Sequence, residues 1–323
     1  MTDECISEVP GGVDVLLSTY NGSSYVREML DSLLQQSFQG FDLLVRDDCS
    51  TDNTLSILNE YRSRFNGRLR VIDDSRGNLG PAQSFKALLN ETEADYVLFA
   101  DQDDVWLPEK VQVLVAEMIE EEKRSPGIPV LVHSDLEVVD ENMHSISSSF
   151  WGYQGLKPDR TGLSNIMIQN IVTGCATVVN RALVEMMKDM PEEATMHDWW
   201  AAMVASTFGV IGTVSVPLIR YRQHGANTLG AKRYGPGYVI KRGISVFSSQ
   251  RLSEFRSSIS LSQKQAEAFL DRYSSELSSE QTSLLEGFVS LGSKGWIERR
   301  LYLLRNGVLK HGISRNIGLM MSV

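Results

Sequence analysis

The sequence has few cysteines and no paired cysteine motif. Its 323 residues include three cysteines, Cys5, Cys49 and Cys175, and no two of them form a Cys-x-x-Cys pair. An odd number of widely spaced cysteines argues against a disulfide framework and against a structural zinc site. We therefore expect a protein of a reducing compartment.

Long apolar runs are also missing. The longest, residues 208–219, has 12 residues and is interrupted by Thr213, Ser215 and Pro217, whereas a helix that spans a bilayer needs roughly 20. The first residues are acidic, where a secretory signal would have a basic region followed by an apolar one. We expect no membrane-spanning helix and no export, and hence a cytoplasmic protein.

Basic residues are scarce over most of the chain. The formal net charge is −10, with 31 Lys and Arg against 41 Asp and Glu, which argues against nucleic-acid binding by the whole surface because phosphates require clustered cations. The charge is uneven, since residues 1–231 carry −17 and residues 232–323 carry +7. The glycine-rich phosphate loops GxGxxG and GxxxxGK[ST] do not occur. A nucleotide bound here would therefore need a metal to hold its phosphates.

Short apolar runs alternate with helical patterns, which is typical of an α/β fold with a mostly parallel central sheet flanked by helices. Ser23 or Ser24 is the expected N-cap of the first helix. Beyond Gly230 the strand signals stop and the pattern is helical. We predict two domains, an α/β domain at 1–230 and a basic, mainly helical extension at 231–323. The expected strands are 13–18, 41–46, 69–72, 96–100, 130–139 and 171–179, and the expected helices are 24–36, 54–64, 81–89, 108–122, 182–190 and 199–208.

Polar clusters follow several of these strands, where ligands bind in open α/β sheets. The central cluster is Asp101-Gln102-Asp103-Asp104. Carboxylates two residues apart beside an apolar strand repel each other unless a cation or a hydrogen-bond network offsets the repulsion. A divalent ion shared with substrate phosphates would do so. The alternative is a solvated turn that caps the helix after Pro108.

Two further clusters allow similar alternatives. Thr19-Tyr20-Asn21-Gly22 follows the first strand; it could receive a nucleoside or could simply be a strand-to-helix turn. Asp47 and Asp48 follow the second strand. They could accept a hydrogen bond from a pyrimidine N–H, while Asp52 or Asn53 caps the next helix.

In order and spacing, these clusters resemble family 2 glycosyltransferases of the GT-A fold. The resemblance covers about residues 12–228. Three of its motifs are similar to those of bacterial rhamnosyltransferases that use dTDP-L-rhamnose. In this sequence they are Ala-Asp-Gln-Asp-Asp-Val-Trp, His-Asp-Trp-Trp and Tyr-Arg-Gln-His-Gly. The motifs that carry it are Ser18-Thr19-Tyr20-Asn21-Gly22, Asp47-Asp48-Cys49-Ser50-Thr51-Asp52, Asn78-Leu79-Gly80, Asp101-Gln102-Asp103, Thr173-Gly174-Cys175, His197-Asp198-Trp199-Trp200 and Tyr221-Arg222-Gln223-His224.

The resemblance implies a role for each motif. Asp198 would be the catalytic base, and Asp103 with His224 would bind Mg²⁺ or Mn²⁺. The implied nucleotide-sugar site is Thr19, Tyr20, Asn21, Asp48, Asn78, Gly80, Asp101, Gln102, Arg220 and Arg222. The implied acceptor and sugar pocket is Thr173, Gly174, Cys175, His197, Trp199 and Trp200.

Considered without the resemblance, several of these residues have plainer explanations. Asp198 could cap a helix and the paired tryptophans could be core. His224 could be a surface histidine, and the neighbouring arginines could lie on a solvated strand face.

The C-terminal segment 296–310 has apolar residues at helical spacing, Ile297, Leu301, Leu304 and Val308, beside Arg and Lys. Such a basic amphipathic helix could lie on an anionic membrane surface, here the cytoplasmic face of the cell membrane. It could equally pack on the catalytic domain or on a second copy of the chain.

The resemblance implies an inverting, metal-dependent transferase of L-rhamnose from dTDP-L-rhamnose to a growing surface polysaccharide or its lipid-linked precursor, with no nucleic-acid partner. The alternatives are transfer from another nucleotide sugar such as a UDP-hexose, a nucleotidyltransferase, or a non-catalytic glycan-binding protein.

Overall fold

The computed structural model describes residues 9–225 and 249–323. The chain divides into two compact units that interleave along the sequence. The first takes in residues of Met1–Phe150, Val172–Met190 and Met196–Gly230, and the second residues of Trp151–Ile171, Pro191–Thr195 and Ala231–Val323.

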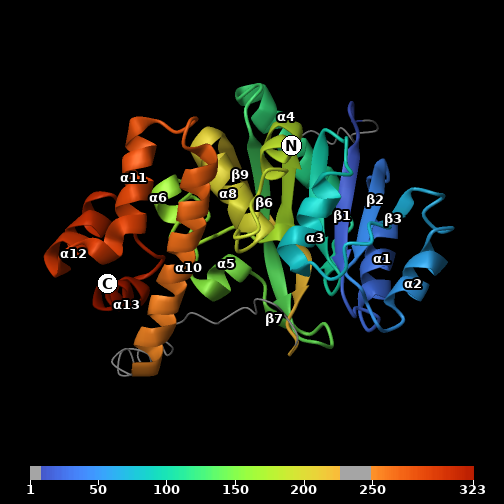
Figure 1. The fold of residues 1–323 in the computed structure, drawn as a ribbon. Helices are drawn as coiled ribbons and strands as arrows, with labels where there is room; N and C mark the ends of the chain where they lie inside the picture. The colour runs from blue at the N-terminus through green and yellow to red at the C-terminus, as the bar shows by residue number, and fades with distance from the viewer. Residues whose placement is uncertain (1–8, 226–248) are drawn as a thin grey trace. The chain divides into compact units, whose positions relative to one another are not determined.

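The first unit is built on a nine-stranded sheet of order β3-β2-β1-β4-β8-β6-β9-β5, with β7 paired to β6 (Figure 1). The strands are β1 Val13–Thr19, β2 Phe41–Asp47, β3 Leu69–Ile72, β4 Tyr96–Asp101, β5 Val105–Trp106, β6 Val130–Val139, β7 Ser145–Ser147, β8 Thr177–Asn180 and β9 Val210–Arg222. The mixed α/β sheet flanked by helices agrees with the predicted fold class.

The sheet is parallel where the βαβ pattern is regular. Strands β3, β2, β1 and β4 pair in parallel, and Val15, Leu16 and Leu17 of β1 are fully buried because helices cover both faces. Beyond β4 the pairing is mixed, since β8 runs antiparallel to β4 and β6, whereas β6 and β9 are parallel. The parallel strands therefore bring the ends of β1, β2 and β4 to one edge.

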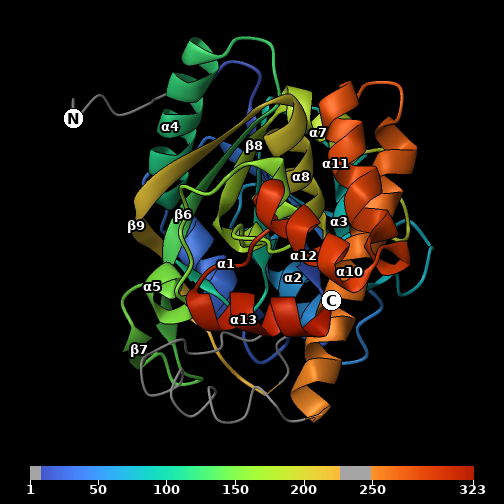
Figure 2. The same cartoon turned by 90° about the vertical axis from the view of Figure 1, so that its left-hand side faces the viewer.

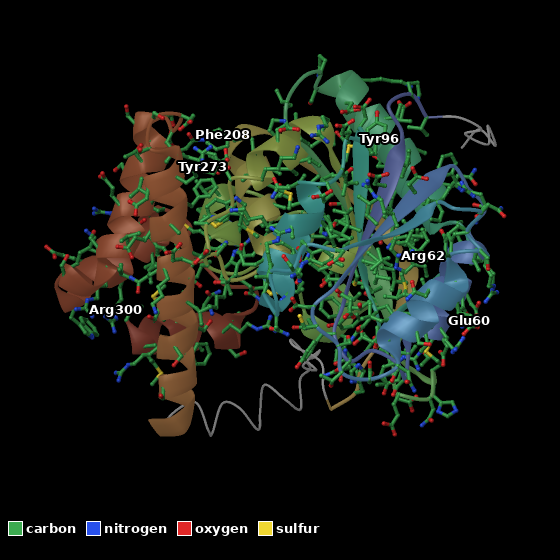
Figure 3. All side chains as sticks on the ribbon, turned by 45° about the vertical axis from the view of Figure 1, so that its right-hand side comes forward. Glu60, Arg62, Tyr96, Phe208, Tyr273 and Arg300 are labelled. Carbon is green, nitrogen blue, oxygen red and sulfur yellow. The ribbon has the colours of Figure 1, made fainter. Side chains whose placement is uncertain are left out.

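Helices pack against this sheet, with α3 against β1 and β2, and α4 against β6, β8 and β9. The Tyr96 hydroxyl of β4, labelled in Figure 3, donates to Glu122 Oε2 of α4 at 2.6 Å. The helices between β1 and β9 are α1 Val26–Leu34, α2 Thr54–Tyr61, α3 Gly80–Leu89, α4 Lys110–Arg124, α5 Phe150–Gln154, α6 Leu163–Ile166, α7 Arg181–Met187 and α8 His197–Phe208.

Two local expectations are wrong. Helix α1 begins at Val26 without a side-chain cap; the Ser23 N–H instead donates to Asp52, whose carboxylate also accepts the Thr54 N–H at the start of α2. The strand expected at 171–179 is shorter, because residues 174–176 form a 3-10 turn before β8. Both differences follow from long-range contacts that local patterns do not contain.

The described C-terminal part of the second unit is helical, as predicted, with residues 231–248 of the predicted extension outside the described ranges. Phe269 and Tyr273 of α10 are buried, and so are Phe288 of α11 and Leu303 of α12. No helix in the described residues is both long enough and apolar enough to span a membrane. The elements are α10 Ser249–Tyr273, α11 Ser279–Val289, the 3-10 helix η2 Ser290–Ser293, α12 Trp296–Arg305 and α13 Ile313–Ser322.

Candidate active site

A cavity of about 730 Å³ lies in the first unit, where β1, β2 and β4 end. The end of β9 and the start of α8 complete its wall. Its lining is Ser18, Tyr20, Asn21, Tyr25, Asp48, Cys49, Asn78, Gly80, Pro81, Phe85, Asp101, Gln102, Asp103, Thr173, Gly174, Met196, His197, Asp198, Tyr221 and His224.

Most of the predicted site residues come together in this cavity. The predicted residues that line it are Tyr20, Asn21, Asp48, Asn78, Gly80, Asp101, Gln102, Asp103, Thr173, Gly174, His197, Asp198 and His224. The predicted residues absent from its lining, all of them in the described chain, are Thr19, Cys175, Trp199, Trp200, Arg220 and Arg222.

Asp48 lies at the end of β2 and is fixed by its surroundings. Its two carboxylate oxygens accept the N–H groups of Leu79 and Gly80, each at 2.7 Å, and the buried Arg46 guanidinium also donates to it. The Asn78 amide donates to the Asp48 carbonyl at 2.9 Å. Because Gly80 has φ +73°, the loop can turn its two N–H groups onto one carboxylate.

The loop after β1 is held to the loop after β4 by one side-chain amide. Gln102 accepts the Tyr20 N–H at 2.9 Å and donates to the Tyr20 carbonyl at 3.0 Å. A Cβ at Gly22 would lie 2.1 Å from Gln102 Oε1, so a side chain at this position would displace the Gln102 amide. Tyr20 itself is half exposed, and its ring is free to cover a planar ligand.

The acidic cluster and His224 meet on one side of the cavity. His224 Nε2 lies 2.7 Å from Asp103 Oδ2, and the His224 ring stacks on Tyr25 with centroids 4.8 Å apart. Burial, together with the charges of Asp103 and Asp198, raises the pKa of Asp101 to about 7. The cavity thus concentrates carboxylates without an equal number of cations.

This donor set fits a divalent metal. Asp103 and His224 offer a carboxylate oxygen and an imidazole nitrogen to the same point, a combination that suits Mn²⁺ and, through the carboxylate, Mg²⁺. A cation there would also offset the repulsion that raises the pKa of Asp101.

Another group, Asp101, Asp104 and Cys175, has ligand atoms within 4.8 Å of one another. Asp104 already has a structural role, however, because it accepts the Arg222 N–H at 3.1 Å. The buried Lys110 side chain donates to the Cys175 carbonyl at 2.6 Å, and burial lowers its pKa well below the usual range. Asp103 and His224 remain the predicted metal ligands.

Asp198 lies in the first turn of α8 and also lines the cavity. Its Oδ2 accepts the Gly174 N–H at 3.1 Å, and burial raises its pKa to about 6. A carboxylate with such a pKa is still ionised at neutral pH and is a stronger proton acceptor than an ordinary aspartate.

His197 lies beside Asp198 and is buried against aromatic rings. Its ring centroid is 4.0 Å from that of Phe85 and 4.9 Å from that of Phe99. Burial lowers its pKa to about 3, so the imidazole is neutral. Both of its nitrogens are buried and, within the described chain, neither has a hydrogen-bond partner; the residue itself lines the cavity.

The remaining predicted residues serve the scaffold. The Thr19 hydroxyl is buried and donates to Asp47, and Trp200 is fully buried in α8. Arg220 is partly exposed and pairs with Glu137 at 3.5 Å. Arg222 donates to the Asp103 carbonyl at 2.9 Å and pairs with Glu28 at 2.5 Å. The structure does not bring either arginine to the cavity, where a diphosphate contact was expected.

Several lining residues were not predicted as site residues. Three of them, Ser18, Cys49 and Tyr221, belong to motifs already singled out, and their position at or next to strand ends was a usable signal. Tyr25 directly precedes α1 and Phe85 lies on α3, where an aromatic residue is expected to belong to the core. The residues missed by the prediction are Ser18, Tyr25, Cys49, Pro81, Phe85, Met196 and Tyr221.

Comparisons with known proteins agree on one family. The family model described as "Glycosyl transferase family 2" matches residues 14–184. The dTDP-rhamnosyl transferase RfbG of Shigella flexneri is 25% identical over 228 residues, which cover 67% of this chain and 74% of RfbG.

A second relative is the poly(ribitol-phosphate) beta-N-acetylglucosaminyltransferase TarS of Staphylococcus aureus, 39% identical over 92 residues, or 28% of this chain and 16% of TarS. The crystal structure of TarS 1–349 in complex with UDP-GlcNAc superposes with a TM-score of 0.56 at 19% identity, over 96% of this chain and 90% of that one. At this identity the superposition establishes a shared fold.

Proposed function

Because the chain belongs to glycosyl transferase family 2, we propose that it is an inverting, metal-dependent glycosyltransferase that moves L-rhamnose from dTDP-L-rhamnose to a surface polysaccharide or its lipid-linked precursor. The predicted GT-A fold is confirmed by the structural match. The family model establishes that the chain belongs to a glycosyltransferase family. The choice of dTDP-L-rhamnose as the donor is the part that we propose.

The named relatives support a nucleotide sugar and a surface glycan but differ in the sugar. RfbG is a dTDP-rhamnosyl transferase and covers most of this chain, which favours rhamnose. TarS transfers N-acetylglucosamine and was solved with UDP-GlcNAc, which keeps a UDP-hexose donor as the alternative.

One observation carries the mechanism: Asp198 faces the same cavity as the Asp103–His224 pair. In the proposed reaction Asp198 takes the proton of an acceptor hydroxyl while the hydroxyl oxygen attacks the anomeric carbon. The bond from that carbon to the diphosphate oxygen breaks, and the nucleoside diphosphate leaves with the bonding electrons. Attack from the opposite face inverts the anomeric configuration.

The other residues would hold the donor. Tyr20 would cover the base, and Asp48, Asn78 and Gly80, which line the cavity, would border the nucleoside. Mg²⁺ or Mn²⁺ held by Asp103 and His224 would neutralise the charge that develops on the leaving diphosphate. Thr173, Gly174 and His197 border the space next to Asp198, where the transferred sugar and the acceptor would meet.

Calorimetric titration with dTDP and Mn²⁺ tests the metal assignment. We expect Asp103→Ala to lose most of the Mn²⁺-dependent part of the affinity, because one ligand is removed. Asp42→Ala, at an exposed position of β2, is the matched control and should bind as the parent does. Unchanged Mn²⁺-dependent binding by Asp103→Ala would contradict the assignment.

A panel of nucleotide sugars tests the donor. We expect release of dTDP from dTDP-L-rhamnose, stimulated by acceptor, to exceed release of UDP from UDP-hexoses. A nucleotidyltransferase would instead release diphosphate from a nucleoside triphosphate, and a glycan-binding protein would release no nucleotide from any donor.

The proposal includes an organisation for the whole chain, with a catalytic domain at 1–230 and an extension at 231–323. A lipid-linked acceptor would bring the protein to the cytoplasmic face of the cell membrane. The extension would serve that contact or assembly with a second copy.

A further inference from the structure

Helix α12 turns its apolar side outward. Trp296 is 67% exposed, Ile297 63% and Leu304 58%, and Leu301 is exposed as well. Among the residues of α12, Leu303 is buried. The apolar side chains that recur at helical spacing in this segment therefore point mostly to solvent. So many exposed large apolar side chains on one helix are unusual.

Contacts with α11 fix this orientation. The Tyr302 hydroxyl donates to the Leu284 carbonyl, and its ring packs so closely that a Cβ at Gly287 would lie 2.4 Å from it. Glu298 accepts the Gly295 N–H at 2.8 Å and caps the helix. Because Tyr302 faces inward and successive helical residues turn by about 100°, Trp296, Ile297 and Leu304 lie on the other side of the helix.

Helix α13 also exposes apolar side chains. Ile313 is 80% exposed and Ile317 is also exposed, one turn apart on the same side of the helix. Figure 2 shows α12 and α13 next to each other in the second unit. We call the set Trp296, Ile297, Leu301, Leu304, Ile313 and Ile317 the α12–α13 face.

Cations border this face. The Arg300 guanidinium lies 3.9 Å from the centre of the Trp296 ring, and Figure 3 shows Arg300 on the surface of the second unit. Lys294, Arg299 and Arg305 lie on or next to the same helix, against one acid, Glu298. Across the described residues, none of these four cations forms an ion pair with a carboxylate.

We propose that the α12–α13 face binds the surface of an anionic lipid bilayer. Apolar side chains would enter the boundary between headgroups and acyl chains, Trp296 would sit at headgroup level, and Arg300 and Arg305 would meet lipid phosphates. A second copy fits less well, because a two-fold contact through this face would place the same cations opposite one another. The inference stands independently of the proposed donor and acceptor.

Sedimentation of the full chain with vesicles tests the proposal. We expect binding to vesicles of phosphatidylcholine with phosphatidylglycerol, little binding to phosphatidylcholine alone, and release by salt. Leu301→Ser with Leu304→Ser should lower the partition coefficient by roughly tenfold or more, since two apolar side chains no longer insert. Arg300→Glu with Arg305→Glu should lower it by a similar factor.

The matched control is Leu55→Ser with Val216→Ser, which changes two exposed apolar residues of the first unit and should leave vesicle binding unchanged. Release of nucleotide from a soluble donor should be unchanged in all three double variants. Equal sedimentation of the parent and the Leu301/Leu304 variant would overturn the proposal. So would a dimer of the parent in light scattering that this variant lacks, because the face would then belong to a second copy.

Discussion

At the scale of single residues, Asp198 and His197 supply two different functions from adjacent positions of α8. Asp198 keeps a carboxylate in a site where burial raises its pKa to about 6. His197 is neutral because burial lowers its pKa to about 3. One residue can therefore take a proton near neutral pH, while the other can act only through hydrogen bonds and packing.

Asp198→Asn should lower the transfer rate by roughly 10²- to 10⁴-fold, the usual effect of a general base, and leave donor binding unchanged. In the parent, kcat should fall about tenfold per pH unit below pH 6, because protonated Asp198 cannot accept the acceptor's proton. Since His197 stays neutral in this range, the acid limb reports the carboxylates of the cavity, Asp198 and Asp101.

Stability provides the control for this variant. Charging a buried carboxylate whose pKa is raised lowers the free energy of unfolding as the pH rises from about 4 to above 6. Asp198→Asn removes that charge, so its Tm at pH 8 should not be lower than that of the parent. A variant that transfers sugar at the parent rate would exclude Asp198 as the base.

His197→Phe keeps an aromatic ring against Phe85 and Phe99 and removes both ring nitrogens. We expect an unchanged Tm and a drop in kcat/KM on the order of tenfold, equal to one or two lost hydrogen bonds to substrate. His197→Asn should instead lower the Tm, because it leaves a cavity beside Phe85. If His197→Phe has the parent kcat/KM, then His197 is only a core residue.

At the scale of elements, β9 carries two arginines, Arg220 and Arg222, and the sequence alone does not show which of them is buried. Arg222 is buried and joins three segments, through the Asp103 carbonyl, the Glu141 carbonyl and the Glu28 carboxylate. Arg220, two residues earlier, is partly exposed and paired with Glu137. Residues two positions apart on a strand point to the same face of the sheet. Which of the two arginines is buried therefore depends on the elements that pack against that face.

Arg222→Met should lower the free energy of unfolding by about 2–4 kcal/mol, because it removes the hydrogen bonds of the buried guanidinium to the Asp103 and Glu141 carbonyls and to Glu28. It should also weaken Mn²⁺-dependent binding of dTDP, since the Asp103 backbone loses its support. Arg220→Met is the control on the same strand and should change stability by less than about 1 kcal/mol. Urea unfolding measures both, and equal losses in the two variants would contradict the supporting role of Arg222.

Most strands of the first unit could be predicted from the sequence. Strands 13–18, 41–46, 69–72, 96–100 and 130–139 were predicted close to their observed bounds, because buried parallel strands are short apolar runs between turn residues. Tyr20, Asn21, Asp48 and residues 101–103 lie at the ends of those strands, whereas Asp198, Thr173, Gly174 and His224 were implied by the family resemblance. The role of Thr19 followed from neither, since its hydroxyl faces Asp47 on a neighbouring strand, a contact made only when the sheet assembles.

At the scale of the whole molecule, the second unit is assembled from distant parts of the chain. The Lys157 N–H donates to His311 Nδ1 at 2.9 Å, and the His311 N–H donates to Gln169 Oε1 at 2.9 Å. The Thr195 N–H donates to Gln265 Oε1 at 2.7 Å. The composition shift near residue 230 predicts a single boundary, whereas these bonds link segments on both sides of it.

A chain ending at residue 230 should therefore be less stable than the full protein, because residues 151–171 and 191–195 lose their partners in the second unit. We expect a lower Tm, a broader unfolding transition and binding of a hydrophobic dye, measured beside the full chain. A fragment 1–230 that unfolds as sharply and at the same temperature as the full chain would contradict this expectation.

The close contact between Gly174 and His197 limits which substitutions the sequence can accept at these two positions. A Cβ at Gly174 would lie 2.6 Å from His197 Nε2, so even alanine at 174 would push the imidazole out of its aromatic niche. The two positions are expected to covary, with a bulkier residue at the first tolerated only beside a shorter one at the second. A change at Gly174 would then have to follow a change at His197, which makes this corner of the cavity slow to change.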